Sequence, residues 1–344
     1  MKVSYIVVIV LLLAAVAAAW YLQRADFPLP SGESVSVEET SDEDVESTFE
    51  QTASVGGGRD IRITDGTRHS IPLDEILSGG PGKDGIPSID DPKFISPDEA
   101  DFLVADDIGL GLTIEGESRF YPYKILVWHE IVNDTLAGEP VMVTYCPLCA
   151  TGIVFERKVA GEVQEFGVSG RLWQSNLLMY NRADSEDEES LWSQVLGEAV
   201  VGPNTGERLP IIRSDIVQFG DWIERNPDTT VLSRDTGASR NYGRDPYGGY
   251  YSSDSVSFGA EFTDDRLHPK DLVHGVEIDG QFKAYHHDAL AVGTTIDQFA
   301  GSEITITKSD IGEVSFSADG ESLSSIPGFW FSWVAVHPES ELYQ

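Results

Sequence analysis

The sequence is long enough for one large domain or two ordinary ones, and it is strongly acidic. Its 344 residues include 58 aspartates and glutamates against 23 lysines and arginines, which gives a formal net charge of −35. A surface of this sign repels phosphate backbones, so the composition argues against nucleic acid as a partner. Salt screens the self-repulsion of such a chain, and the composition is typical of proteins from extreme halophiles.

An uninterrupted apolar segment lies near the N-terminus. Residues 5–22 carry no charge, and Lys2 lies just before them. A segment of this length is sufficient to span a bilayer, and the lysine favours a cytoplasmic N-terminus. The small residues at 17–19 also fit the cleavage site of a signal peptide. We therefore expect residues 1–23 to be a membrane anchor or a signal peptide, with the globular part extracytoplasmic, or secreted after cleavage.

Residues 24–57 consist mostly of serine, threonine and acidic residues. Such a segment has too few apolar residues to offset the entropy of ordering, so we expect a disordered acidic linker. The folded part is expected to comprise two units, a first β-rich unit over residues 58–262 and a second, shorter one over residues 263–344.

A β-hairpin is predicted over residues 110–123, followed by a short helix that carries His129 on its buried side. The histidine is either a satisfied core residue or a metal ligand that faces the cysteines further along the chain. Glu130, Asn133 and Asp134 follow closely and are suited to orienting a ligand or to acid–base chemistry.

Both cysteines lie in one short motif, Cys146-Pro-Leu-Cys149, between two apolar runs rich in β-branched residues. Such runs predict strands, which places the cysteines on a hairpin turn. A strand on each side is similar to the metal-binding knuckle of rubredoxins and zinc ribbons, whereas redox pairs usually precede a helix. Thiolates suit one copper or zinc ion, with His129 as the nearest further histidine ligand. A reducible disulfide or redox pair, and a purely structural pair, are the alternatives.

A polar stretch follows between predicted strands, beginning at residue 166. Its polar residues either line a pocket for a small polar ligand or form an internal hydrogen-bond network. They are Ser169, Arg171, Ser175, Asn176, Arg182 and Gln194. Residues 242–251 add four tyrosines among glycines, which suits a binding loop or a loop packed on the domain.

The chain contains two weak internal repeats. Residues 111–121 align with 275–285 at an offset of 164, and residues 222–231 align with 333–342 at an offset of 111. Two matches in the same order indicate a duplication whose second copy is shorter and lacks the cysteine hairpin.

Several motifs resemble the signatures of the domain of unknown function 3179 (DUF3179) family. They lie at residues 84–94, 129–134, 144–152, 166–172, 190–194, 268–270 and 333–338. The resemblance covers nearly everything from Asp84 to the C-terminus and implies no particular activity. Ala150 departs from it, because many members have glycine there.

The sequence thus predicts an α+β fold of mostly antiparallel sheet, with two related halves packed together and an N-terminal transmembrane helix. The predicted function is a metal-binding or thiol-redox role at Cys146 and Cys149, with no reaction specified. The alternative is a non-catalytic binding module for a small polar ligand, with the cysteines structural.

Overall fold

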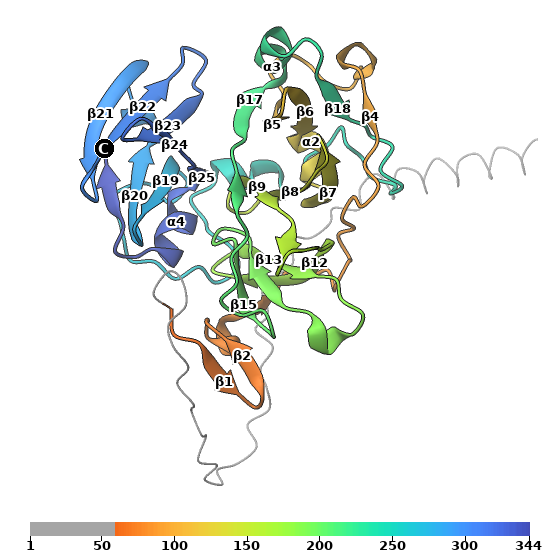
Figure 1. The fold of residues 1–344 in the computed structure, drawn as a ribbon, viewed down its shortest axis with the longest axis vertical. Helices are drawn as coiled ribbons and strands as arrows, with labels where there is room; N and C mark the ends of the chain where they lie inside the picture. Colours follow the sequence, from red (N-terminus) through yellow and green to blue (C-terminus); the bar gives the residue numbers. More distant parts are fainter. Residues whose placement is uncertain (1–58) are drawn as a thin grey trace, which may run out of the picture. The chain divides into compact units, whose positions relative to one another are not determined.

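The computed structural model describes residues 59–344 (Figure 1). The predicted anchor or signal peptide and the acidic linker lie outside these residues. Within residues 59–344, no helix has the length and apolar character needed to cross a membrane.

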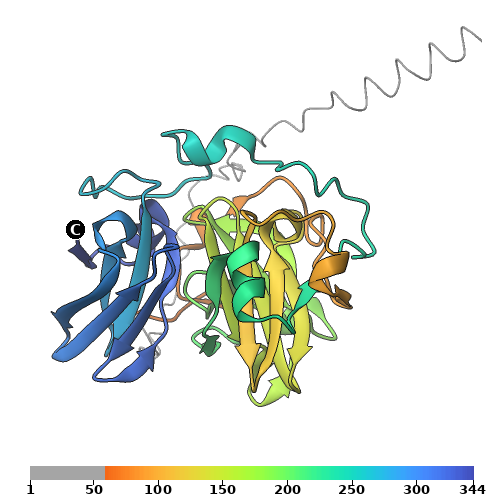
Figure 2. The ribbon, with the colours of Figure 1, turned by 90° about the horizontal axis from the view of Figure 1, so that it is seen from above.

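The described chain consists mostly of antiparallel strands, as predicted, in small sheets with a propeller-like arrangement (Figure 2). The helices between them are short. The α-helices are α2 (Tyr123–Leu126), α3 (Phe219–Arg225) and α4 (Trp330–Val336). The 3-10 helices are η1 (Leu73–Glu75), η2 (Pro97–Glu99), η3 (Glu186–Glu188), η4 (Gly248–Ser252) and η5 (His287–Ala289).

Three sheets and one small hairpin make up the part of the chain up to β18. The first sheet has the order β17 (Asp215–Gln218), β5 (Ile108–Ile114), β6 (Glu117–Pro122), β18 (Thr230–Leu232) and β4 (Phe94–Ile95). The second has the order β16 (Ile211–Ile212), β9 (Thr151–Glu156), β8 (Glu139–Cys146) and β7 (Ile131–Leu136). The third has the order β1 (Arg62–Thr64), β2 (Thr67–His69), β15 (Glu198–Val201), β14 (Leu191–Ser193), β13 (Asn176–Asn181), β12 (Phe166–Trp173) and β3 (Leu77–Ser78). The hairpin pairs β10 (Lys158–Val159) with β11 (Glu162–Val163).

Two further sheets form the C-terminal part. One has the order β25 (Ile326–Phe329), β19 (Leu272–Ile278), β20 (Gln281–His286) and β26 (Glu341–Tyr343). The other is a meander of β21 (Gly293–Phe299), β22 (Ser302–Lys308), β23 (Val314–Ala318) and β24 (Glu321–Leu323).

The sheets that contain β5–β6 and β19–β20 share one pattern of strand pairing. Each has a hairpin flanked by an antiparallel strand on one side and a parallel strand on the other, and in the first sheet β4 adds a further strand beyond the parallel one. Gly111 pairs with Asp215, and Gly275 pairs with Ile326, which are the positions expected from offsets of 164 and 111. The repeated sequence segments therefore form strands with equivalent pairing partners in the two sheets.

The same equivalence extends to packing. A Cβ atom added to Gly111 would lie 2.4 Å from the ring of Trp222, and one added to Gly275 would lie 2.1 Å from the ring of Trp333. Only glycine leaves room for the indole at these two positions. Each indole also donates a hydrogen bond of 2.8 Å, from Trp222 to Thr229 and from Trp333 to Ser340.

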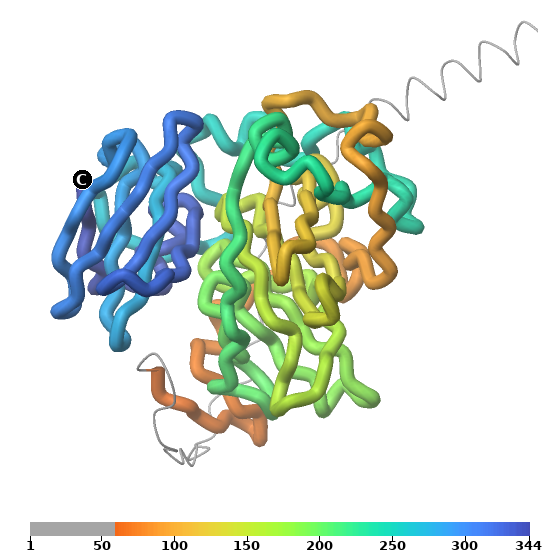
Figure 3. The backbone as a smooth tube through the Cα atoms, turned by 45° about the horizontal axis from the view of Figure 1, so that its top comes forward, coloured from red at the N-terminus to blue at the C-terminus, as the bar shows by residue number. Residues whose placement is uncertain are grey.

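The chain between hairpin and edge strand differs in length between the two parts. After β6 the backbone passes through α2, β7, β8 and β9 and then through β10–β15 before it returns at β16 and β17 (Figure 3). After β20 only η5 and the meander β21–β24 intervene before β25. Residues 157–210 thus have no counterpart in the C-terminal part. The turn between β22 and β23 corresponds to the cysteine turn but contains no cysteine.

The predicted helix at His129 is shorter than expected. α2 is a single turn that ends at Leu126, and Glu130 has a φ of 60°. A left-handed residue cannot continue an α-helix, so the chain reverses there and enters β7. His129 and Glu130 consequently lie on the connection from α2 to β7 and not on a helix face.

Candidate functional site

The cysteines lie where the sequence placed them, on the turn between two buried strands. Cys146 ends β8 and pairs with Thr151, the first residue of β9, and the Cys149 N–H donates to the Cys146 carbonyl at 3.2 Å. Both are free thiols, with exposed fractions of 1% and 0%.

Strand periodicity explains which way Cys146 points. β8 is buried on both faces, so alternate residues enter different hydrophobic clusters. Val141 and Val143 pack in one cluster, whereas Met142 and Cys146 pack in the other, together with Cys149. A shift of one residue in register would move the Cys146 thiol to the opposite face of the sheet.

Both thiols face the same backbone carbonyl. The Cys149 Sγ lies 3.3 Å and the Cys146 Sγ 3.9 Å from the oxygen of Ser175, and the two sulfurs also hydrogen-bond each other. The Asn176 amide donates to the Cys149 Sγ at 3.5 Å. Ser175 and Asn176 belong to the β12–β13 turn, so a second hairpin lies directly against the cysteine turn.

Gln194 holds this second hairpin in place. Its side-chain oxygen accepts hydrogen bonds from Asn176 at 2.9 Å and from Thr151 at 2.7 Å, while its amide donates to Thr144 at 3.1 Å. Ser175, Asn176 and Gln194, three of the six predicted polar residues, therefore do gather beside the thiols. They form a saturated network between β8, β9 and β13.

The other three predicted polar residues lie elsewhere. Ser169 donates to the Leu178 carbonyl and accepts from the Arg171 N–H, which stabilises an irregularity in β12. The Arg171 side chain is exposed. Arg182 forms ion pairs with Asp90 at 2.6 Å and Asp84 at 3.3 Å, away from the thiols.

The two thiols differ in acidity. Burial, and then the hydrogen bond to Cys149, raises the pKa of Cys146 well above its usual value. Burial also acts to raise the pKa of Cys149, but hydrogen bonds from Cys146, Ser332 and Asn176 outweigh it and lower that pKa. Donors around a sulfur stabilise its anion, so Cys149 ionises before Cys146.

A buried carboxyl lies beside the pair. Glu130 is 6% exposed, and burial together with the neighbouring Cys146 raises its pKa to about 8, an effect that a hydrogen bond with Tyr247 partly offsets. A carboxyl with such a pKa exchanges protons near neutral pH, as a general acid or base does. The predicted acid–base residue thus lies close enough to Cys146 to interact with it electrostatically.

His129, the predicted third metal ligand, is engaged by other groups. Its Nδ1 lies 2.7 Å from the Pro87 carbonyl and its Nε2 lies 2.7 Å from the Tyr242 hydroxyl. Burial lowers its pKa, so the ring stays neutral. In residues 59–344 no group of three or more histidine, cysteine, aspartate or glutamate side chains is placed to hold a metal ion.

Asn133 and Asp134 also have structural partners. Asn133 accepts from the Phe166 N–H at 2.9 Å and donates to the Phe166 carbonyl at 2.8 Å, which joins β7 to β12. Asp134 accepts from the Tyr121 hydroxyl at 2.6 Å and from Arg119. Neither carries a described contact to the thiols.

Backbone strain is concentrated around the thiols. Thirteen described residues other than glycine have positive φ, and eight of them precede a glycine that also has positive φ. The five others are Asp84, Glu130, Ala150, Gln174 and Ser175. Four of these, all except Asp84, lie on the cysteine turn, on the hairpin that faces it or at the buried carboxyl. Strained residues persist where the surrounding structure over-determines them, and they cluster at functional sites.

A long irregular connector covers the thiols. The chain from residue 233 to residue 271 contains no strand and only η4 (teal in Figure 2). Tyr250 in η4 donates to the Leu148 carbonyl, within the cysteine turn, at 3.0 Å. Further along, the Ser257 carbonyl accepts from Ser175 at 2.6 Å and the Glu261 N–H donates to Gln174 at 2.7 Å. We call residues 247–262 the cover.

Lys270, at the end of the same connector and just before β19, fastens the cover. It is 8% exposed, and its ammonium donates to the carbonyls of Tyr250 and Ser253, the latter at 2.9 Å, while it lies 3.5 Å from the centre of the Tyr250 ring. A charged donor with two carbonyl acceptors and an aromatic face is a strong local attachment. This explains why a lysine follows His268 and Pro269 in the motif at residues 268–270.

Sequence reasoning did not identify two contributors to the site. Ser332, at the start of α4, approaches Cys149, and the Phe329 N–H donates to the Cys149 carbonyl at 2.9 Å. Both come from the C-terminal part of the chain, and no local pattern marks them. The tyrosines of the cover were visible as an unusual cluster, but their target was not.

The comparisons with known proteins agree with the motifs. The family model described as "protein of unknown function (DUF3179)" matches residues 83–318, which is most of the chain. The chain belongs to the DUF3179 family. The match includes the cysteine turn, Glu130, the cover and Lys270, so every part of the site except Ser332 and Phe329 lies within it. A search of curated proteins and a search of solved structures each found no match.

Proposed function

We propose that this DUF3179 protein is an extracytoplasmic thiol–disulfide redox protein in which Cys146 and Cys149 alternate between two thiols and one disulfide. The observation that carries the proposal is a pair of free thiols on one turn, facing one carbonyl and hydrogen-bonded to each other. Their unequal acidity and the buried carboxyl of Glu130 support it.

In the proposed thiol–disulfide exchange, Cys149, Cys146 and Glu130 each act in one step. The Cys149 thiolate attacks one sulfur of a disulfide in a partner, and one partner thiolate leaves. Cys146 then transfers its proton to Glu130 and attacks the Cys149 sulfur of the mixed disulfide, which releases the second partner thiolate. The pair loses two electrons and the partner disulfide gains them, and the reverse sequence reduces the pair.

Access to the thiols requires movement of the cover. Both sulfurs are buried, and Tyr250 lies against the cysteine turn. An irregular connector of this length in a compact domain is typical of functional segments, such as lids. We propose that a partner engages the pair when residues 247–262 swing away from it, while the buried state protects the thiols from further oxidation.

The test is a redox titration of the native protein. Equilibration with mixtures of reduced and oxidised glutathione, followed by acid quench and thiol labelling, should give one two-electron transition that converts two free thiols to none. Cys146→Ser and Cys149→Ser should each abolish it. Under glutathione, Cys146→Ser should accumulate a mixed disulfide at Cys149, whereas Cys149→Ser should accumulate little. A pair that stays fully reduced in oxidised glutathione, even after mild loosening of the fold, would contradict the proposal.

Copper or zinc binding is the second candidate, because two sulfurs on one side of a turn suit a soft cation. His129 is engaged by Pro87 and Tyr242, so further ligands would have to come from Glu130 or from rearrangement. Metal analysis of native protein, with Cys146→Ser as control, separates the candidates. One equivalent of copper or zinc that the variant loses would favour the metal site over the redox pair.

We also propose that the two sheets with matching strand pairing arose by duplication, within units of residues 58–262 and 263–344, and that the N-terminal segment anchors the chain to a membrane. The equivalent registers and the paired Gly–Trp contacts support the duplication, and the apolar run at residues 5–22 supports the membrane anchor.

The duplication predicts that Gly111→Ala and Gly275→Ala each lower the free energy of unfolding by about 1–3 kcal/mol, through overpacking against tryptophan. Gly82→Ala, where nothing lies within 4 Å, should be nearly neutral. Unequal effects of the first two substitutions would contradict equivalent packing.

A further inference from the structure

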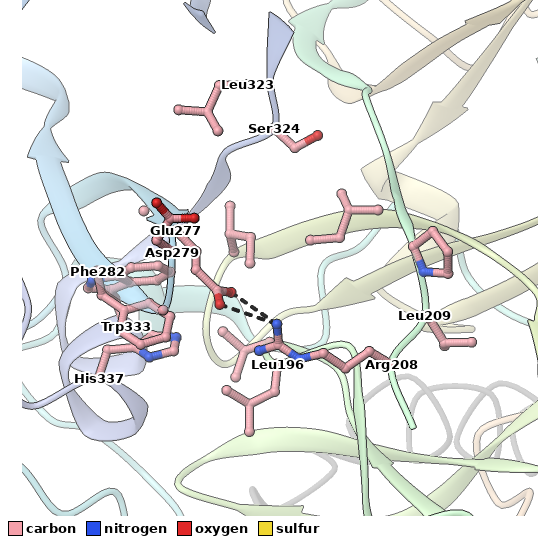
Figure 4. A pocket seen from close by; sticks show the side chains of 16 residues that line it. Leu196, Arg208, Leu209, Glu277, Asp279, Phe282, Leu323, Ser324, Trp333 and His337 are labelled. Carbon is pink, nitrogen blue, oxygen red and sulfur yellow. Dashed lines mark hydrogen bonds and ion pairs between the residues drawn. The ribbon is translucent and has the colours of Figure 1, made fainter. Parts of the chain in front are cut away.

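A second site lies outside the cysteine turn and its cover, and nothing in the redox chemistry uses it. A cavity of about 630 Å³ opens between the loops flanking β15 and the sheet that contains β19 and β20. Cavities of 300–1,000 Å³ are the usual size for small-molecule sites. Figure 4 shows its two kinds of wall, aromatic side chains on one side and an ion pair that crosses from Arg208 to Glu277.

The aromatic wall consists of three rings in mutual contact, of which one pair is stacked. His337 stacks on Phe282, with ring centres 3.8 Å apart, and it lies 4.4 Å from Trp333. Burial and the nearby arginines, Arg59 and Arg208, lower the pKa of His337 to about 3, so its ring carries no charge at neutral pH. This wall therefore presents uncharged π surfaces, which attract cations.

The polar wall carries an excess of negative charge. Arg208, Glu277 and Asp279 line the cavity, which leaves one uncompensated carboxylate among them. Glu198 lies behind Arg208, with a carboxylate oxygen 3.5 Å from the Arg208 Nε, and it competes with Glu277 for this guanidinium. Glu198 is 0% exposed, and neither of its oxygens has a hydrogen-bond partner among the described residues.

Glu277 retains capacity to accept hydrogen bonds. Arg208 reaches its two oxygens with one nitrogen, at 3.3 and 3.2 Å. Charge-assisted N–H···O bonds are usually 2.7–2.9 Å long, so these two contacts are weak. A stronger hydrogen-bond donor inside the cavity could therefore bind the Glu277 carboxylate and would lose only the weak contacts of Glu277 with Arg208.

We propose that this cavity binds a small organic cation, a primary amine whose apolar or aromatic body packs on Phe282 and Trp333 while its ammonium donates to Glu277. Asp279 adds a second negative charge at the same wall. The overall charge of −35 raises the concentration of cations at the surface and favours their entry over that of anions.

The test is calorimetric titration of the full chain with three probes that share one aromatic body, at fixed high ionic strength. Phenethylamine should bind, phenethyl alcohol should bind at least about tenfold more weakly, and hydrocinnamate should not bind. Methylammonium, which lacks the aromatic body, should give no specific signal. Hydrocinnamate binding as tight as that of the amine, or no binding of any probe, would overturn the proposal.

Three variants locate the site. Glu277→Gln should weaken phenethylamine at least about tenfold and leave phenethyl alcohol unchanged. Ser324→Trp, at a residue lining the cavity, should fill the space and remove both ligands. Glu162→Gln, at an exposed carboxylate on β11, is the matched control and should change neither affinity. If the Glu277→Gln variant is too unstable to titrate, Asp279→Asn removes the second carboxylate of the same wall from an exposed turn, and it should also weaken phenethylamine without changing phenethyl alcohol. An equal response to Glu277→Gln and Glu162→Gln would refute the assignment.

Discussion

At the scale of single residues, Glu130 has the most unusual environment in the site. It combines a left-handed backbone, a buried carboxyl and a pKa raised to about 8. The helix turn before it and the strand after it fix this position, and Tyr145 donates its N–H to the Glu130 carbonyl at 2.8 Å. A buried carboxyl is costly for folding, and strongly perturbed pKa values cluster at functional sites, which is why we assign Glu130 to the proposed proton exchange with Cys146.

Glu130 should make stability fall as pH rises. Because its pKa is higher in the folded state than in the unfolded chain, the folded protein binds more protons between about pH 4.5 and 8. Its contribution is fully present below that window and is lost through it. From pH 5 to 8.5 the free energy of unfolding of the wild type should fall by up to about 4 kcal/mol relative to Glu130→Gln. Urea denaturation at several pH values measures this, with Glu162→Gln as control. Parallel pH profiles for wild type and Glu130→Gln would contradict the raised pKa.

Ala150 provides a second prediction at this scale. Its φ of 52° is left-handed, which costs an L-residue roughly 1–2 kcal/mol, more than the entropic cost of glycine. Ala150→Gly should therefore raise the free energy of unfolding by about 0.5–1 kcal/mol. Ala238→Gly, at a residue without positive φ, should not stabilise the protein. Thermal unfolding of reduced protein distinguishes the two, and a destabilised Ala150→Gly variant would show that the lost methyl contact dominates.

At the scale of elements, the cover is the part whose movement the redox proposal needs. Tyr250 hydrogen-bonds the cysteine turn and belongs to the hydrophobic cluster that holds the two thiols, and six further apolar side chains of the cover pack against that cluster. Lys270 binds two carbonyls of the cover itself. Opening of the cover therefore breaks these apolar contacts as well as the hydrogen bonds, in a local transition that leaves the rest of the domain folded.

Lys270→Met should expose the thiols. Loss of the ammonium leaves the carbonyls of Tyr250 and Ser253 without their donor, which should cost about 2 kcal/mol and favour opening by roughly tenfold or more. The rate of thiol labelling by a soluble disulfide reagent should increase accordingly. Lys158→Met, which removes a surface ion pair on β10, should leave the rate unchanged. Equal labelling rates in both variants would mean that the thiols are reached by another route.

Local elements were predictable from the sequence, whereas the contacts between them were not. Alternating β-branched residues predicted the strands around Cys146 and Cys149, and Glu115-Gly116 predicted the turn of the β5–β6 hairpin, because these depend on neighbouring residues alone. Ser332 reaches Cys149 across 183 positions of sequence, since 332 − 149 = 183. The direction of His129 likewise depends on Tyr242, from a distant connector.

At the scale of the whole molecule, charge is the dominant feature. Even if every lysine and arginine were paired, 35 acidic residues would have no such partner, because 58 − 23 = 35. The described ion pairs are mostly at the surface, where each contributes little. Mutual repulsion among the remaining carboxylates therefore opposes the compact state.

This repulsion predicts strong stabilisation by salt. The Debye length falls from about 10 Å at 0.1 M to about 3 Å at 1 M, so the Tm should rise steeply over that range and level off above it. Calorimetry in potassium chloride and potassium sulfate at matched ionic strength separates screening from solute exclusion. Screening gives equal Tm values in both salts, whereas exclusion gives a higher Tm in sulfate. A Tm that does not change between 0.1 and 1 M potassium chloride would show that the acidic surface does not limit stability.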